Sequence, residues 1–200
     1  MAWSTPRDWT TSEVVTAANM DTYISDNLTY LYTQVSSQFM MSAKGGTPST
    51  TSGCAGAVQV EFGTNDVDLY SCAFDGTAVE YIQWSHPMPS DYGGGTVTAK
   101  FYWYCPNAST NSAKWGLQGT ALGDSDAIDA TWGTIQEIAD ANNADKDLNI
   151  SAATPAITIA NTPVAGDMVQ WRVQRDPTDV ADDLAVDALL LWVAVTYTRT

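Results

Sequence analysis

The sequence predicts a mainly β protein, an antiparallel jelly-roll-like β-sandwich preceded by an extended N-terminal arm and a short α-helix. Residue types that favour strands are plentiful, including 8 tryptophans and 9 tyrosines among 200 residues, whereas good helix formers are scarce. Short segments of alternating apolar and polar residues recur along the chain between turn signals. Their number and the long connections between them favour a jelly roll over an immunoglobulin-type sandwich.

The chain begins with an arm, residues 1–15, that reads as extended. Trp3, Pro6, Arg7 and Trp9 lie on this arm, far from the bulk of the apolar sequence. Large aromatic side chains on a segment without a core of its own are typical of contacts with another subunit. We therefore predict that these four residues attach the protein to a neighbouring chain.

A short helix is expected to follow the arm. Thr16 offers a side-chain oxygen to the free amides of the first turn, as an N-cap residue does. Within the helix, Ile24, Leu28 and Leu31 follow the four-three spacing of a short coiled-coil seam. A helix of this length is not stable alone, so it needs a partner or a docking surface. Self-association through these three residues is our prediction, and the alternative is a helix packed on its own domain.

The remaining chain divides into two regions by composition. Residues 36–53 are rich in Ser, Thr, Gly and Pro and are predicted to form an extended linker between the N-terminal region, 1–35, and a sandwich over 54–200. Within the sandwich we expect strands at 57–62, 67–74, 78–84, 96–104, 114–121, 133–138, 148–151, 156–159, 167–173 and 188–198.

The charge of the chain excludes several kinds of partner. Its formal net charge is −15 and its pI is near 4.1. Direct binding to nucleic acid is not expected, because phosphate contacts require clustered Lys and Arg. Anionic membrane surfaces are disfavoured for the same reason. No apolar stretch is long enough to span a membrane, and the first residues lack the pattern of a signal peptide.

The sequence predicts neither a catalytic site nor a cofactor. His86 is the single histidine, lies in a Pro-rich stretch after an expected strand, and is interpreted as a loop residue. Cys54, Cys72 and Cys105 lack metal-binding spacing. Cys72 and Cys105 lie in strand-like sequence and are predicted to be buried free thiols. The aspartates that cluster late in the chain are interpreted as solvated loop carboxylates. A structural calcium ion remains an alternative for them, although no complete calcium-binding loop is present.

Exposed aromatic side chains are the most plausible ligand-binding residues. Tryptophan faces stack well against the apolar faces of sugar rings, but most tryptophans of this chain lie inside expected strands, where a core position is the default. Trp132 differs because it follows a loop and precedes Gly133. We therefore select Trp132 as the candidate glycan contact.

The N-terminal region resembles the start of many tailed-bacteriophage virion proteins. The resemblance is carried by Thr5-Pro6-Arg7-Asp8-Trp9, by Glu13-Val14-Val15-Thr16-Ala17-Ala18 and by Asp26-Asn27-Leu28. Three further stretches, 88–103, 166–176 and 187–193, are similar to a β-sandwich domain that recurs in phage and prophage proteins. The resemblance implies a structural protein that is made in the host cytoplasm and incorporated into the virion.

Three functions follow from this resemblance. The first is an assembly role as a tail-fibre, appendage or head-decoration subunit that contacts other phage structural proteins, with a homotrimer expected by analogy with phage fibres. The second is a receptor-binding module that recognises a host-surface glycan. The third is a depolymerase, which is least favoured because no catalytic signature is present. Non-enzymatic assembly is the preferred prediction.

Overall fold

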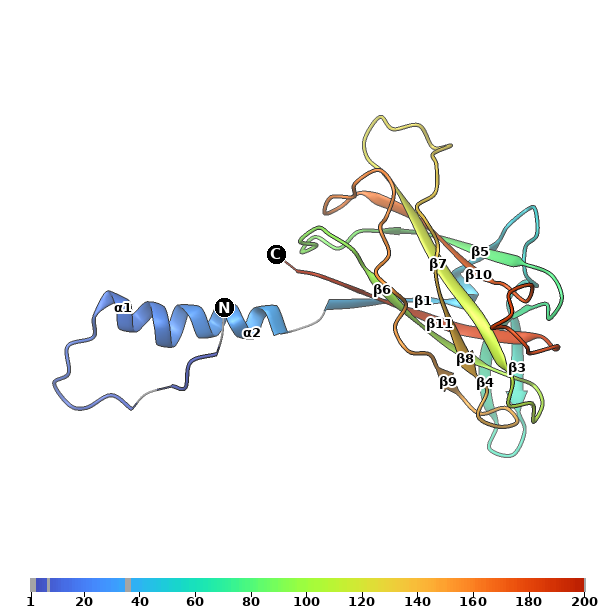
Figure 1. Ribbon diagram of the computed structural model, residues 1–200, viewed down its shortest axis with the longest axis horizontal. Coiled ribbons are helices and arrows are strands. Elements are labelled where there is room, and N and C mark those ends of the chain that lie inside the picture. Colours follow the sequence, from blue (N-terminus) through green and yellow to red (C-terminus); the bar gives the residue numbers. More distant parts are fainter. Residues whose placement is uncertain (1–2, 7, 35–36, 200) are drawn as a thin grey trace.

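The computed structural model describes residues 3–6, 8–34 and 37–199. Figure 1 shows a β-sandwich and an N-terminal helical region that extends away from it. Arg7 and the predicted domain boundary at residues 35 and 36 lie outside the described residues. Within the described residues, none of the helices combines the length and the apolar character that crossing a membrane requires.

The N-terminal helix has three consecutive parts, α1 (Ala17–Met20), the π-helical turn η1 (Asp21–Ser25) and α2 (Asp26–Gln34). The predicted N-cap is confirmed, because the Oγ1 atom of Thr16 accepts a hydrogen bond from the backbone N–H of Asn19 at 3.2 Å. Figure 1 shows this helix pointing away from the sandwich, so the alternative of packing on its own sandwich is wrong.

The arm folds back along the helix. The backbone N–H of Ser4 donates to Oδ1 of Asn27 at 2.9 Å, and Nδ2 of Asn27 donates to the carbonyl of Ser4 at 2.8 Å. Asn27, which makes this reciprocal pair, is buried between the helix and the arm. We call the arm and helix together, residues 3–34, the N-terminal hairpin.

The chain after the hairpin forms the predicted sandwich. Its strands are β1 (Ser37–Ser42), β2 (Thr47–Pro48), β3 (Val58–Phe62), β4 (Val67–Phe74), β5 (Glu80–Pro87), β6 (Thr98–Tyr104), β7 (Ser112–Leu122), β8 (Gln136–Ala141), β9 (Asn149–Ile150), β10 (Met168–Arg175) and β11 (Ala188–Tyr197), with a 3₁₀ turn η2 (Ala43–Gly45) between β1 and β2.

In the described part of the chain these strands form two sheets. The six-stranded sheet has the order β3-β4-β11-β6-β9, with β1 also on β11, and the five-stranded sheet has the order β2-β5-β10-β7-β8. Four antiparallel pairs are nested within one another: β4 with β11, β5 with β10, β6 with β9, and β7 with β8. This nested pairing is a long double ribbon rolled into two sheets, which is the jelly-roll arrangement. The predicted fold class is confirmed.

The linker predicted over 36–53 is wrong for its described residues. Residues 37–42 form β1, which pairs along β11, and residues 47–48 pair with β5. The composition misled because glycine here serves close packing rather than flexibility. A Cβ atom on Gly46 would lie 2.6 Å from Ile82 and 2.7 Å from Trp84, so the chain crosses these side chains only with glycine at this position.

The core lies between the two sheets and is rich in aromatic side chains. Trp103, Trp115 and Trp171 are fully buried. Trp115 packs edge-on against Phe74 with ring centroids 5.1 Å apart, and Phe101 stacks on it at 5.8 Å. Aromatic pairs in these geometries add to the stabilisation from apolar burial. These tryptophans occupy strand positions whose side chains point into the core, which is the position expected for them.

A buried ion pair corrects the interpretation of one late aspartate. Asp182 is not a solvated carboxylate, because its side chain is fully buried against that of Arg175. Nε and Nη2 of Arg175 donate to the two carboxylate oxygens, each at 2.9 Å. Nη1 of Arg175 donates to the carbonyls of Phe74 and Val186 at 3.1 and 2.7 Å. One side chain therefore holds together the ends of β4, β10 and the segment before β11.

The three cysteines are buried and unpaired, which confirms the prediction for Cys72 and Cys105. Cys54 and Cys72 lie together, and a hydrogen bond to Cys72 together with burial raises the pKa of the Cys54 thiol. Among the described residues, no group of three or more His, Cys, Asp or Glu side chains is arranged to hold a metal ion.

Candidate functional site

The outer face of the five-stranded sheet carries a row of polar side chains. Along β10, Trp171 and Val173 are buried in the core, whereas Gln170 and Arg172 are partly exposed on the other face. Strands alternate the direction of their side chains, so the neighbouring β5 adds Tyr81 to the same outer face. We call this outer face, together with the segment that carries Trp132 and Gly133, the polar face.

Arg172 lies at the centre of the polar face, between two aromatic rings. Its Cζ atom is 4.5 Å from the ring centroid of Trp132 and 4.7 Å from that of Tyr81. With the Gln118 amide oriented to satisfy both neighbours, its oxygen accepts from Nε and Nη2 of Arg172 at 2.6 and 2.5 Å, and its nitrogen donates to the Gly133 carbonyl at 2.8 Å. Burial lowers the pKa of the Arg172 guanidinium, which nevertheless stays charged.

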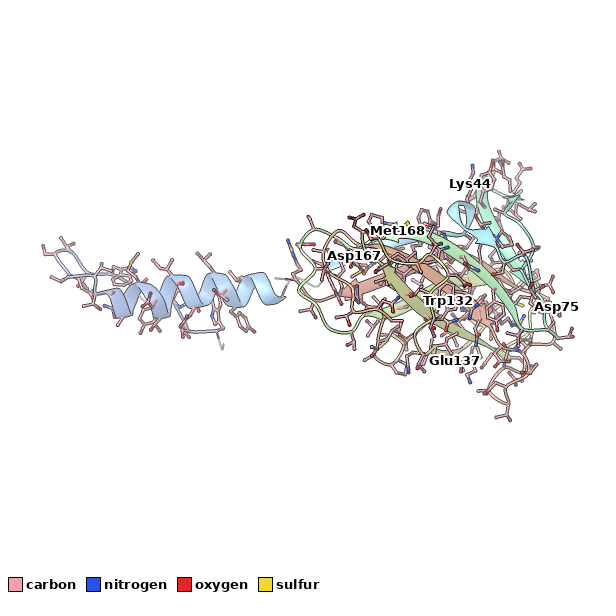
Figure 2. All side chains as sticks on the ribbon, turned by 90° about the horizontal axis from the view of Figure 1, so that it is seen from above. Lys44, Asp75, Trp132, Glu137, Asp167 and Met168 are labelled. Carbon is pink, nitrogen blue, oxygen red and sulfur yellow. The ribbon has the colours of Figure 1, made fainter. Side chains whose placement is uncertain are left out.

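The segment that carries Trp132 is held closely over β7. The backbone N–H of Gly133 donates to the carbonyl of Gly119 at 3.1 Å. A Cβ atom on Gly133 would lie 2.5 Å from the carbonyl oxygen of Thr158, so this approach requires glycine. Figure 2 shows Trp132 between Met168 of β10 and Glu137 of β8. The tryptophan is therefore positioned by backbone contacts rather than by a mobile loop.

Hydrogen bonds between side chains order the rest of the polar face. Nε2 of Gln83 donates to Oγ of Ser49 at 2.8 Å, and Nε2 of Gln170 donates to Oε1 of Gln83 at 3.3 Å. Oγ of Ser85 donates to Oε1 of Gln170 at 2.6 Å. This chain fixes the amide groups while each keeps further hydrogen-bonding capacity. The face thus presents preoriented donors and acceptors.

Two adjoining hollows lie on the polar face. One, of about 400 Å³, is lined by residues 49–52 and by Tyr81, Gln83 and Arg172. The other, of about 300 Å³, is lined in part by Gln83, Ser85, Trp132 and Gln170. Gln83 borders both hollows, so they lie next to each other on the polar face.

His86 does not belong to this site. It lies within β5 rather than in a loop, which corrects the sequence interpretation. Its ring stacks on Phe39 at 4.4 Å with an interplanar angle of 5°. The strand continues through Pro87 because its pairing with β10 extends to Met168.

The structure brings Trp132 together with residues that sequence reasoning missed. Tyr81 and Arg172 lie inside the expected strands 78–84 and 167–173 and were not selected as candidate site residues. A signal was available in the alternation of β10, because Arg172 lies between the buried Trp171 and Val173. Its pairing with the two rings depends on the tertiary structure alone.

A second surface, on the outer face of the six-stranded sheet, is apolar. Trp192 is 44% exposed, which corrects the core position expected for it. Leu148, Ile150 and Met40 are exposed on the same sheet. A hollow of about 240 Å³ here is lined by Phe62, Leu69, Tyr102, Tyr104, Lys146, Leu148, Leu191 and Trp192. Large exposed apolar patches are common at interaction sites.

The remaining candidate residues lie on the N-terminal hairpin. Trp3 rests against Tyr30 with ring centroids 6.0 Å apart, and Trp9 rests against Tyr23 at 6.3 Å. Both tryptophans nevertheless stay exposed, at 44% and 40%, and Pro6 is exposed on the same arm. The arm therefore packs partly on its own helix, a contact that the sequence did not indicate.

The predicted seam of the helix stays exposed among the described residues. Ile24, Leu28 and Leu31 are 41%, 62% and 48% exposed. They lie three or four positions apart and therefore share one side of the helix. The hairpin therefore exposes these three side chains as well as its two tryptophans.

Comparison with known proteins yields structural matches only. No protein-family model matches the sequence, and no curated protein matches it. The CBM22-2 xylan-binding domain of Paenibacillus barcinonensis Xyn10C matches with a TM-score of 0.44 and 12% identity, over 80% of this chain and 99% of that one. A CBM28 module specific for non-crystalline cellulose matches with a TM-score of 0.43 and 15% identity, over 78% of this chain and 86% of that one. The C-terminal CBM6 of LamC, a laminarinase from Zobellia galactanivorans, matches with a TM-score of 0.40 and 6% identity, over 80% of this chain and 99% of that one. Similarity at this level carries no information about a ligand of this chain.

Proposed function

We propose that the polar face binds carbohydrate and that the protein is a non-enzymatic module that recognises a host-surface glycan. The observation that carries the proposal is the ordered cluster of Trp132, Arg172 and Tyr81 beside the amides of Gln83 and Gln170. Sugars combine apolar ring faces with many hydroxyl groups. Aromatic side chains serve the first and preoriented amide and guanidinium groups serve the second.

The size and rigidity of the site support the same proposal. The hollows of about 400 and 300 Å³ fall in the range of small-ligand sites. The hydrogen bonds among Ser49, Gln83, Gln170 and Ser85 hold the polar groups in place before a ligand arrives. Preorganisation of this kind lowers the entropic cost of binding.

We expect Trp132→Ala to weaken glycan binding about tenfold or more, because it removes an aromatic contact and one of the two rings that flank Arg172. Binding is measured on a glycan array and then by calorimetry with the best ligand. Trp192→Ala is the matched control, since it removes an exposed tryptophan from the opposite outer face. Equal loss in both variants, or unchanged binding by Trp132→Ala, would contradict the assignment of the polar face.

A second function, assembly into a virion through the N-terminal hairpin, is favoured by a separate observation. The hairpin extends from the sandwich and exposes Ile24, Leu28 and Leu31 together with Trp3 and Trp9. Such surface becomes stable when another chain covers it. The resemblance of this segment to phage virion proteins supports a virion setting. The two functions are compatible, since one end attaches and the other recognises.

Deletion of residues 1–15 tests the attachment role. We expect the sandwich to stay folded, because the arm contacts described above go to the helix and not to the sheets. The shortened protein should be absent from purified particles, as measured by quantitative immunoblotting against the full-length chain. Loading at the normal copy number would refute attachment through the arm.

A further inference from the structure

The guanidinium of Arg172 is held as a fixed fork with one edge free. The rings of Trp132 and Tyr81 lie within 4.7 Å of Cζ, and the Gln118 oxygen accepts from Nε and Nη2. Among the described residues, no hydrogen bond engages Nη1 of Arg172. The side chain also lines the larger hollow of the polar face. Arginine with one edge fixed presents the other for bidentate contact.

Arg172 also lacks a counter-ion within the described chain. Lys114 pairs with Glu137 and Asp179, Arg175 with Asp182, and Arg199 with Asp91. Acidic residues outnumber basic ones by 23 to 8, so an unpaired, partly buried arginine is notable in this sequence. Its charge is stabilised by two ring faces and one neutral amide. A ligand that brings a negative charge to this position completes the pairing.

We propose that the glycan bound by the polar face is acidic and that a sugar carboxylate, of a uronic or ulosonic acid, occupies the free edge of Arg172. This inference rests on the proposed function. A planar carboxylate matches the guanidinium fork in two parallel hydrogen bonds. Gln83 and the hydroxyls of residues 49–52 line the same hollow and are placed for the sugar hydroxyls. The net charge of −15 repels polyanions at long range, so recognition relies on this short-range contact.

The test uses the full chain and matched pairs of polysaccharides. Polygalacturonate, alginate, hyaluronate and polysialic acid are each compared with their carboxyl-reduced forms, beside neutral glucans, mannans and xylans. We expect at least one acidic polymer to bind, and its reduced form to bind about 10- to 100-fold more weakly, the loss typical of a hydrogen bond to a charged group. Arg172→Gln should remove this difference. Lys100→Gln, which removes an exposed cation from the other sheet, should leave it unchanged.

Each outcome decides between the two proposals. Equal binding of acidic and reduced polymers, or binding to neutral glycans only, overturns the carboxylate assignment and leaves glycan binding intact. Absence of binding to every polymer overturns both. Should Arg172→Gln lower the melting temperature, Arg172→Lys provides the second measurement. It keeps the charge but not the fork, so it should retain a preference for the acidic polymer at reduced affinity. A variant that loses neutral and acidic binding equally would also refute the carboxylate contact.

Discussion

Asp182→Ala is expected to lower the free energy of unfolding by about 3–5 kcal/mol, because it leaves the Arg175 charge buried without a partner. Both side chains are inaccessible to solvent and form two hydrogen bonds of 2.9 Å. Asp182 also accepts from the backbone N–H of Lys114 at 2.8 Å, so the substitution removes an anchor of β7 as well. For a domain of this size the melting temperature should fall by roughly 6–20 °C.

Urea and thermal unfolding, followed by tryptophan fluorescence, measure this loss. Asp124→Ala is the control, because Asp124 is exposed and its replacement should change stability by no more than about 0.5 kcal/mol. Asp182→Asn should fall between the two, since it removes the charge but keeps an acceptor for Arg175. A loss by Asp182→Ala within the range of the control would show that the ion pair does not stabilise the sandwich.

Replacement of both Leu28 and Leu31 by Asp should convert an oligomer into a monomer. The two side chains are 62% and 48% exposed in the single chain. If a second copy covers them, two carboxylates in the seam would cost several kcal/mol. Analytical ultracentrifugation gives the mass directly, and three copies are expected for the unaltered chain by analogy with phage fibres.

Thr22→Asp is the matched control on the same helix, because Thr22 is exposed outside the seam. A dimer in place of a trimer would retain self-association and correct only the number of copies. A native chain that stays monomeric at the highest soluble concentration would contradict self-association in solution. A separate variant tests the apolar outer face around Trp192. If copies also meet there, Trp192→Asp should weaken the same oligomer.

The sequence was sufficient for the fold class and for most strand positions. Alternating side chains mark the buried face of a strand without reference to any partner, so segments such as 67–74 and 96–104 were located to within a few residues. The number of strands and the long connections between them favoured a jelly roll over an immunoglobulin-type sandwich, but the order of the strands in the sheets was not predicted. The N-cap at Thr16 was also predictable, because capping involves only the next few residues.

Other features depended on contacts between distant residues. Residues 36–53 were predicted to form a linker, yet Gly46 is required where the chain crosses Ile82 and Trp84. Asp182 read as a solvated acid, and only the fold places Arg175 against it. Trp192 read as a core residue because its strand is apolar on both faces, which leaves its direction undetermined.

The candidate site shows the same division. Sequence position singled out Trp132 as an aromatic side chain outside a regular strand. The cluster itself required the pairing of β5, β10 and β7 and the crossing of the segment at Gly133, which together bring Trp132, Arg172 and Tyr81 within contact. Local patterns determine which face of a strand a side chain occupies, whereas only strand order and register determine its neighbours on that face.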